Sequence, residues 1–345
     1  MINDSTGNLL RSDADALVNT VNCVGFMGKG IALQFKQAYP ENFRAYQRAC
    51  RAESVVPGKM FVFETGMMVN PKWIINFPTK RHWRGKSRVE DIKSGLAALT
   101  REVEERGIRS IAIPPLGCGN GGLKWSLVRP LIEAAFEHLP NVRVDLYAPR
   151  GAPDARQMPV RTSKPNMTPA RALIVKLMEQ YQQMAYRLTL LEVHKLMYFM
   201  QEAGEHLKLG FVKGPYGPYA ERLRHVLSLI EGHFITGYGD AEDDPEKQIE
   251  LNTQAWERAE RYLRNHFETH ARFDRVGDLI RGFETPYGME VLATVHWVAK
   301  QEGASAEDDA VAGVYAWNDR KRMFQERHIR VAWEVLDEKG WLAQG

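Results

Sequence analysis

The first 150 residues alternate short apolar stretches with longer amphipathic ones, and this alternation restricts the fold more than any other feature of the sequence. Five stretches are typical of buried strands: DALVNTV (15–21), MFVFET (60–65), WIINFP (73–78), SIAIPPL (110–116) and VRVDLYA (142–148). Between them, apolar residues recur at helical spacing over 30–52, 87–107 and 125–139. Strands that alternate with helices predict an α/β/α sandwich, which binds ligands outside the carboxyl ends of its strands.

The chain changes character at a proline-rich segment. Residues 149–169, PRGAPDARQMPVRTSKPNMTP, contain five prolines and little apolar periodicity, as is typical of an extended linker. We therefore predict a first domain over 1–150, a linker over 151–169 and a second domain over 170–345. The second domain is predicted to be mainly α-helical, with a sharp break at GPYGPY (214–219) and with helices at 170–188, 189–203, 219–231, 250–268, 286–301 and 325–339.

Composition argues against membrane insertion, secretion and a cysteine-bound metal. No apolar run reaches membrane-spanning length, and the N-terminus MINDSTGNLL lacks the basic start and apolar centre of a signal peptide. The three cysteines, Cys23, Cys50 and Cys118, are an odd number without metal-ligand spacing, which favours reduced thiols over disulfides or zinc. We therefore expect a cytoplasmic protein with no membrane contact, no metal and no cofactor.

Residues 7–35 are predicted to form a short strand, a second strand that ends in polar residues, and then the glycine loop GFMGKGIALQF (25–35), which opens a helix. It is not a Walker A loop, because only two residues separate Gly25 from Gly28 and a glycine, not Ser or Thr, follows Lys29. Without a Cβ on Gly28 and Gly30, a diphosphate can approach the backbone and the N–H groups of the following helix. Asn22 can bridge a ribose hydroxyl. The alternative is a tight turn between strand and helix with Asn22 as a turn residue.

A second glycine-rich loop, PPLGCGNGGLKW (114–125), also lies between a strand and a helix, with four glycines in six residues. A connection with only a structural role could avoid the unfolded-state entropy that each glycine adds. Two such loops in one domain therefore predict a clamp that closes over a diphosphate from two sides.

The basic segment NFPTKRHWRGKSR (76–88) follows a third strand and contains five Lys/Arg. Most such runs are solvated surface loops. Because this one lies at the same edge of the sheet as the glycine loops, we expect Lys80 to face the ligand. Trp83 or His82 can then stack on an unpaired base, and Arg81, Arg84, Lys86 and Arg88 can contact a nucleic-acid backbone.

NTVNCVGFMGKGIALQFK together with PPLGCGNGGLKW resembles a macrodomain, the ADP-ribose-binding α/β fold, over residues 1 to about 150. With the FPTKRHWRGKSR loop, the chain resembles the DarG family of antitoxins. The resemblance implies an enzyme that removes ADP-ribose from thymidine in single-stranded DNA by cleaving the N-glycosidic bond. It also implies a partner, a DarT-type DNA ADP-ribosyltransferase toxin.

The resemblance also implies site residues. Lys80 corresponds to the catalytic lysine, and Thr79 precedes it and can orient it. Substrate-binding positions are Asn8 and Leu9 at the adenine-side strand end, Thr20, Val21 and Asn22 at the distal ribose, Gly28, Lys29, Gly30, Ile31, Ala32 and Leu33 at the diphosphate, and Gly117, Cys118, Gly119, Asn120 and Gly121 in the second clamp.

Lys80 can work in two ways. It can attack the anomeric carbon as a free amine, with Arg81 and Lys86 lowering its pKa by like-charge repulsion, or it can stay charged and protonate the departing base. The similar terminal ADP-ribose protein glycohydrolases place an aspartate in the second glycine loop, whereas the corresponding residue here is Gly121. No carboxylate partner for Lys80 is therefore evident.

The second domain resembles Panacea-type antitoxin domains in VHKLMYFMQEAG (193–204) and KGPYGPYAERL (213–223), which implies that it captures the toxin. The acidic runs at 239–250 and 307–309 can mimic DNA phosphates on the toxin, or can be ordinary solvated loops. Two other functions stay open: a macrodomain that reads ADP-ribose without catalysis, and a deacylase or hydrolase that acts on O-acetyl-ADP-ribose or on modified protein.

Overall fold

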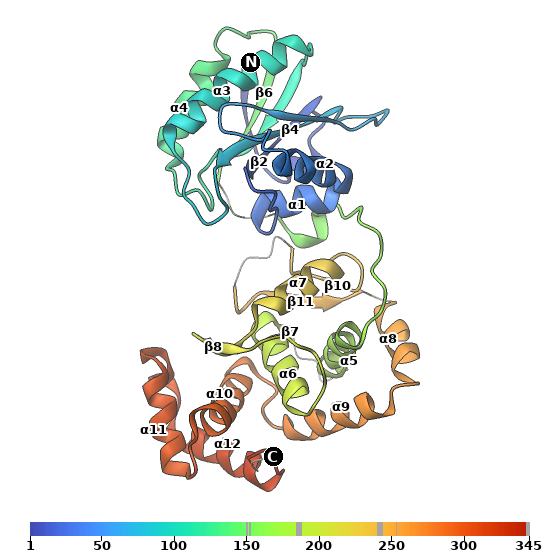
Figure 1. Cartoon of the computed structure of the whole chain (residues 1–345), viewed down its shortest axis with the longest axis vertical. Helices are drawn as coiled ribbons and strands as arrows, with labels where there is room; N and C mark the ends of the chain where they lie inside the picture. Colours follow the sequence, from blue (N-terminus) through green and yellow to red (C-terminus); the bar gives the residue numbers. More distant parts are fainter. Residues whose placement is uncertain (150, 152, 184–187, 240–243, 253, 343–345) are drawn as a thin grey trace. The chain divides into compact units, whose positions relative to one another are not determined.

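The computed structural model describes the chain except residues 150, 152, 184–187, 240–243, 253 and 343–345 (Figure 1). The described residues form two compact units, the first built on Met1–Ser163 and the second on Lys164–Tyr238 and the C-terminal third of the chain. The change of unit falls inside the segment predicted as a linker. Before it, Ala155–Gln157 forms a 3-10 helix, and the Arg161 N–H donates to the Gln37 carbonyl (2.9 Å). The segment up to Arg161 is therefore attached to the first unit.

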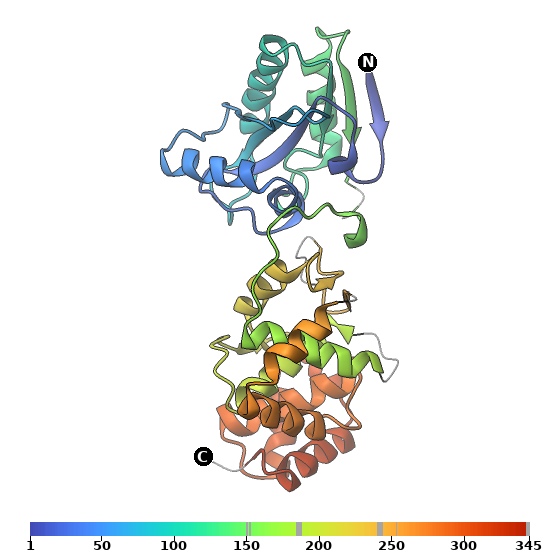
Figure 2. The ribbon, with the colours of Figure 1, turned by 90° about the vertical axis from the view of Figure 1, so that its right-hand side faces the viewer.

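A six-stranded sheet forms the centre of the first unit, with strand order β1-β6-β5-β2-β4-β3. β3 is antiparallel to β4, and all other neighbours are parallel. Figure 2 shows β1 beside β6 at one edge. The strands are β1 (Ile2–Ser5), β2 (Ala16–Asn22), β3 (Phe61–Glu64), β4 (Trp73–Lys80), β5 (Ser110–Ile113) and β6 (Arg143–Tyr147). Because β2, β4 and β5 are parallel neighbours, the loops after them emerge at one edge of the sheet.

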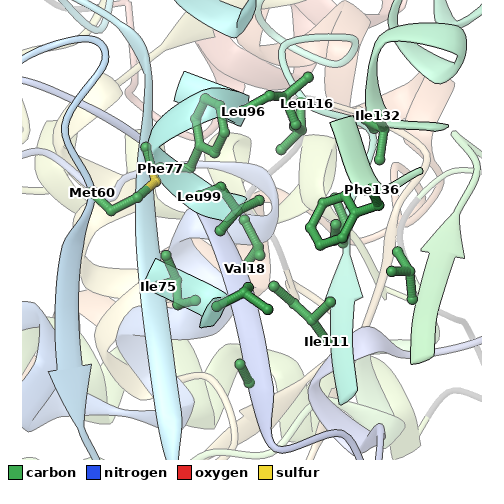
Figure 3. Close-up of a cluster of buried hydrophobic side chains, with 14 of the residues drawn as sticks. Val18, Met60, Ile75, Phe77, Leu96, Leu99, Ile111, Leu116, Ile132 and Phe136 are labelled. Atoms are coloured by element: carbon green, nitrogen blue, oxygen red, sulfur yellow. The ribbon is translucent and has the colours of Figure 1, made fainter. Parts of the chain in front are cut away.

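Helices cover both faces of this sheet, because successive strand residues point to opposite sides. Val18 packs with Leu99 and Ile132 on the face covered by α3 (Val89–Glu105) and α4 (Trp125–Phe136), as Figure 3 shows. Leu17 packs on the other face, where α1 (Gly30–Ala38) and α2 (Pro40–Arg51) lie. The predicted α/β/α sandwich is confirmed.

Two local predictions in the first unit are wrong. The helix expected over 30–52 is two helices, because Pro40 cannot donate a hydrogen bond within a helix and instead begins α2. The short strand expected from residue 7, with Asn8 and Leu9 at its end, is a 3-10 helix at Leu9–Arg11. Gly7 has φ +90°, and the Asn8 side chain accepts from the Leu10 N–H (3.0 Å), so the local bond of Asn8 ends the extended chain there.

The second unit is mainly helical, as predicted. Its helices are α5 (Pro169–Gln183), α6 (Leu190–Glu202), α7 (Glu221–Ile230), α8 (Ala255–Leu263), α9 (Phe267–Leu279), α10 (Pro286–Glu302), α11 (Glu307–Trp317) and α12 (Glu326–Glu338). The helix predicted over 250–268 is wrong: its start belongs to strand β11 (Gln248–Leu251), which pairs with β7 (Leu188–Thr189) and β10 (Ile235–Thr236). The helix predicted over 170–188 ends at Gln183, and Leu188 belongs to β7 instead. Residues 184–187 of that prediction and 240–243 of the acidic run 239–250 lie outside the described residues.

The GPYGPY break is a hairpin of β8 (Val212–Gly214) and β9 (Gly217–Tyr219). Gly217 has φ +91°, which favours glycine, and a Cβ there would lie 2.9 Å from Thr294 Oγ1 on α10. The Trp317 Nε1–H donates to the Gly214 carbonyl (2.8 Å), and Lys195 Nζ donates to the Pro218 carbonyl (2.7 Å). The hairpin is therefore fastened to three helices of the second unit.

The stability of the second unit should rise with pH, because burial lowers the pKa of Lys195 to about 7 from its usual 10.5. Between these values the unfolded chain binds more protons than the folded chain, so Lys195 raises the free energy of unfolding by at most about 1.4 kcal/mol per pH unit. Lys321, whose pKa burial lowers to about 8, adds a rise of its own over the same range. Urea denaturation between pH 7 and 9 measures this slope. Lys195→Met should flatten it, and an identical slope in that variant would contradict the assignment.

Candidate active site

The three predicted loops meet at one edge of the sheet. Lys80 closes β4, and its Nζ donates a hydrogen bond to the Asn120 carbonyl in the second glycine loop. A Cβ built on Gly30, in the first glycine loop, would lie 3.5 Å from the Asn120 side-chain nitrogen. The Cys23 thiol donates to the Lys80 carbonyl (3.4 Å). The amine and both glycine loops therefore line the same site.

Asn22 organises the first glycine loop. Its side-chain oxygen accepts from the N–H groups of Val24 (3.0 Å) and Phe26 (3.3 Å), and its side-chain nitrogen donates to the Phe26 carbonyl (2.6 Å). The Tyr46 hydroxyl donates to the Asn22 carbonyl (2.6 Å) from α2. These contacts are those of the turn residue considered above, and a contact between Asn22 and a ribose stays a prediction.

The N-terminus of α1 faces this site. Lys29 is its N-cap residue, and no side chain caps the first turn, which begins at Gly30. Backbone N–H groups at the start of a helix lack partners within the helix and lie at the positive end of its dipole. The first turn of α1 can therefore receive an anion such as a phosphate.

Two exposed glycines leave room beside the backbone. A Cβ built on Gly28 or Gly119 would have no atom within 4 Å, and neither residue has a positive φ. The fold itself therefore does not require glycine at these positions. We assign the presence of glycine there to the close approach of a ligand to the backbone.

We expect Gly28→Ala and Gly119→Ala to fold like the wild type but to bind ADP-ribose about tenfold more weakly, because each added methyl group would overlap the diphosphate. Titration calorimetry measures the affinity, and the thermal midpoint controls for folding. Unchanged affinity in both variants would show that the diphosphate does not lie between these loops.

Backbone hydrogen bonds hold the second glycine loop in shape, one from within the loop and one from the basic segment. Gly117 has φ +70°, the Leu123 N–H donates to the Gly117 carbonyl (3.0 Å), and the Ser87 N–H donates to the Gly121 carbonyl (3.0 Å). A Cβ on Gly121 would overlap the Gly117 carbonyl oxygen and Ser87 Oγ. Position 121 therefore has no room for any side chain, the aspartate considered above included.

Lys80 is half-buried, and burial lowers its pKa. Burial accounts for this shift, and Arg81 forms an ion pair with Asp91 (3.0 Å) that offsets its charge. The predicted repulsion from Arg81 and Lys86 therefore stays a prediction. The amine is thus easier to deprotonate than an ordinary lysine because it is partly removed from water.

Other predicted residues support the site from behind it. The Thr79 hydroxyl is buried and donates to the Val21 carbonyl (3.5 Å), which joins β4 to β2; its predicted role in orienting Lys80 stays a prediction. Asn8 is buried, and its side chain donates to the Gln157 carbonyl (2.9 Å). Leu9, Val21 and Leu33 are buried, whereas Thr20, Ile31 and Ala32 are half-buried.

Burial raises the pKa of Cys118 and of Cys23 to about 11, so both thiols are neutral near pH 7.

Three asparagines that the sequence reasoning missed lie beneath the site. The side chains of Asn19 on β2 and Asn76 on β4 share a hydrogen bond of 2.9 Å, and Asn76 donates to Asn42 on α2 (2.7 Å). All three are fully buried. Hydrogen bonds between buried amides fix the relative positions of the elements that carry them, here β2, β4 and α2, although Asn19 Oδ1 has no partner among the described residues. The sequence contained a signal for this cluster, because one asparagine lies inside each of the apolar stretches ALVNTV and WIINFP.

Comparisons with known proteins agree with this geometry. The Macro domain family model matches residues 18–132. The DNA ADP-ribosyl glycohydrolase of Thermus aquaticus is 46% identical over 97% of this chain and 93% of that protein. The chain belongs to the DNA ADP-ribosyl glycohydrolase family. Its membership confirms the predicted DarG family, the predicted macrodomain and the predicted class of enzyme, an ADP-ribosyl glycohydrolase.

Two further relatives cover only part of this glycohydrolase. The solved macrodomain of Mycobacterium tuberculosis DarG is 56% identical and covers 43% of this chain and 98% of that structure, with a TM-score of 0.43. A DNA ADP-ribosyl transferase-DNA ADP-ribosyl glycohydrolase fusion protein of Thermosipho africanus is 34% identical over 44% of this chain and 44% of that protein.

The described part of the glycohydrolase contains no group of three or more His, Cys, Asp or Glu placed to hold a metal ion. In the same residues, no helix is both long and apolar enough to cross a membrane.

Proposed function

We propose that the first unit removes ADP-ribose from thymidine in single-stranded DNA by cleaving the N-glycosidic bond, and that the second unit binds the cognate DarT-type toxin. The position of Lys80 between the two glycine loops carries the first half of this proposal. A diphosphate held by the loops would bring a ribose of ADP-ribose within reach of the amine. The family name supports DNA as the substrate.

In the proposed reaction the bond between the anomeric carbon and the thymine nitrogen breaks, and thymine leaves with the electron pair and takes up a proton. Partial burial favours the free amine of Lys80, which can attack that carbon. Water then hydrolyses the adduct, releasing ADP-ribose and restoring the amine. The Asn120 carbonyl, which accepts a hydrogen bond from Lys80 Nζ, can hold the amine in place for this attack.

Turnover separates this function from the alternatives. The full chain, incubated with a single-stranded oligonucleotide that carries ADP-ribosyl thymidine, should release free ADP-ribose over many turnovers. Binding without release would indicate a reader of ADP-ribose. Faster release from ADP-ribosylated protein or from O-acetyl-ADP-ribose would indicate one of the other two activities.

The proposed toxin binding has separate support. The relative from Thermosipho africanus, by its name, joins a transferase and a glycohydrolase in one polypeptide, which suggests that the two act as a pair. Phosphate mimicry by Glu307 and Asp308 has less support, because both carboxylates pair with Arg330 (3.3 and 2.8 Å). These acids are better explained as a surface ion-pair network.

An enzyme that cannot hydrolyse its substrate tests the second half of the proposal. Lys80→Ala in the full chain should still bind the purified toxin and inhibit DNA modification in stoichiometric amounts. If neither this variant nor the wild type binds the purified toxin, the proposed capture of the toxin is rejected.

A further inference from the structure

Two exposed aromatic rings stand together beside Lys80, and the proposed reaction itself does not use them. Phe26 lies in the first glycine loop and Trp83 in the basic loop, and their side chains are 58% and 46% exposed. Their ring centroids are 6.1 Å apart with planes inclined by 49°. Large aromatic rings usually gain free energy by burial, so an exposed pair from two separate loops indicates a binding surface.

Both rings are held in place by their own loops. Phe26 donates and accepts backbone hydrogen bonds with the Asn22 side chain, which is itself buried. In the basic loop, the Gly85 N–H donates to the His82 carbonyl (3.0 Å), which forms the turn that carries Trp83. The backbones that carry the two rings are therefore held before a ligand arrives, and binding need not order them.

The surroundings of the rings are basic. The Arg84 guanidinium lies 4.6 Å from the centre of the Trp83 ring, and Lys86 and Arg88 are exposed in the same loop. An apolar protein partner would have to desolvate these charges. A nucleic-acid strand is complementary to them, because its phosphates pair with cations while its unpaired bases stack on aromatic and guanidinium planes.

The position of the pair indicates which base it receives. In the proposed complex the modified thymine lies at Lys80, which is half-buried, whereas Phe26 and Trp83, which we call the rim of the site, are exposed. Asn22, whose side chain binds the Phe26 backbone, pairs with Lys80 across β2 and β4, and Trp83 follows Lys80 by three residues. The strand that leaves the site toward solvent would cross this rim with the base that adjoins the modified one.

We propose that Phe26 and Trp83 form a stacking platform for the unpaired nucleobase next to the modified thymidine, which makes single-stranded DNA a better substrate than an isolated modified nucleoside. This inference rests on the proposed hydrolysis of ADP-ribosylated DNA. The platform acts by holding the strand, and Lys80 remains the group that reacts.

Two substrates test the platform in the full chain: ADP-ribosyl thymidine as a nucleoside, and a short single-stranded oligonucleotide with the same modification. Phe26→Ala and Trp83→Ala should each lower the ratio of kcat/KM for the oligonucleotide to kcat/KM for the nucleoside by about 10-fold to 100-fold. Trp83→Phe should restore most of that ratio. Trp256→Ala, which removes an exposed tryptophan of the second unit, is the matched control and should leave the ratio unchanged.

The outcomes separate the platform from the reaction. If the alanine variants keep the wild-type ratio, no base stacks on these rings. If they lose activity equally on both substrates, the rings serve the modified thymine itself, and the assignment to a neighbouring base is wrong. If the wild type cleaves neither substrate, the proposed hydrolysis fails instead.

Discussion

Lys80→Ala should lower kcat for release of ADP-ribose from modified DNA by about a hundredfold to ten-thousandfold, the usual contribution of a positioned catalytic side chain. Its affinity for ADP-ribose should change little, because the two glycine loops supply the proposed diphosphate contacts from their backbones. Single-turnover assays measure the reaction, and titration calorimetry measures the affinity. Retention of wild-type kcat would reject Lys80 as the catalytic residue.

Lys93→Ala is the matched control, since Lys93 is an exposed lysine on α3 of the same unit. The pH profile then separates the two roles of Lys80. If the free amine attacks, kcat should rise with pH until it passes the lowered pKa of Lys80; if the charged amine protonates the base, kcat should fall over the same range. In the first case the adduct can open its ribose ring, with the ring oxygen becoming a hydroxyl and the Lys80 nitrogen forming an imine, and reduction of that imine with borohydride during turnover should trap a covalent bond to Lys80.

Glu290→Ala should destabilise the second unit by about 3–5 kcal/mol, the usual cost of removing one partner from a buried ion pair. Glu290 and Lys321 are 2% and 0% exposed, with Oε1 and Nζ 2.6 Å apart. The variant would leave the Lys321 charge among apolar and cationic neighbours, Lys195 included. Urea denaturation of the full chain, followed by tryptophan fluorescence, measures the loss.

The surface ion pair of Arg330 and Glu326 is the control. Arg330 is 36% exposed, and Arg330→Ala should change the free energy of unfolding by about 1 kcal/mol or less. A double variant, Glu290→Leu with Lys321→Met, should recover most of the stability because neither charge remains buried. A loss in Glu290→Ala no larger than that in Arg330→Ala would contradict the structural role of the pair.

Glu290→Ala also tests whether the hairpin of β8 and β9 contributes to the proposed toxin binding. Lys321 donates to Thr294 (3.2 Å), against which Gly217 of the hairpin packs. Loss of the ion pair should therefore loosen β8 and β9 while hydrolysis by the first unit continues.

The wrong predictions of strands and helices occur where an interaction of the folded chain overrides the local sequence pattern. The strand expected from residue 7 gave way to the hydrogen bond of Asn8 with Leu10. The helix expected over 250–268 lost its start to β11, because pairing with strands far along the chain decided the conformation of residues 248–251. A periodic pattern reports which face of a segment is apolar, but it does not report such distant partners.

The sequence by itself determined the sandwich of the first unit, the position of both glycine loops and the place of Lys80 after a strand that ends at the same edge, because each depends on residue type and on order along the chain. Only the tertiary structure decided the cause of the lowered pKa of Lys80, the turn role of Asn22 and the absence of space at Gly121. It also brought Phe26 to Trp83 across 57 positions of sequence. Burial and contact between separate loops depend on how parallel strands place their ends side by side, and no single stretch of sequence contains that information.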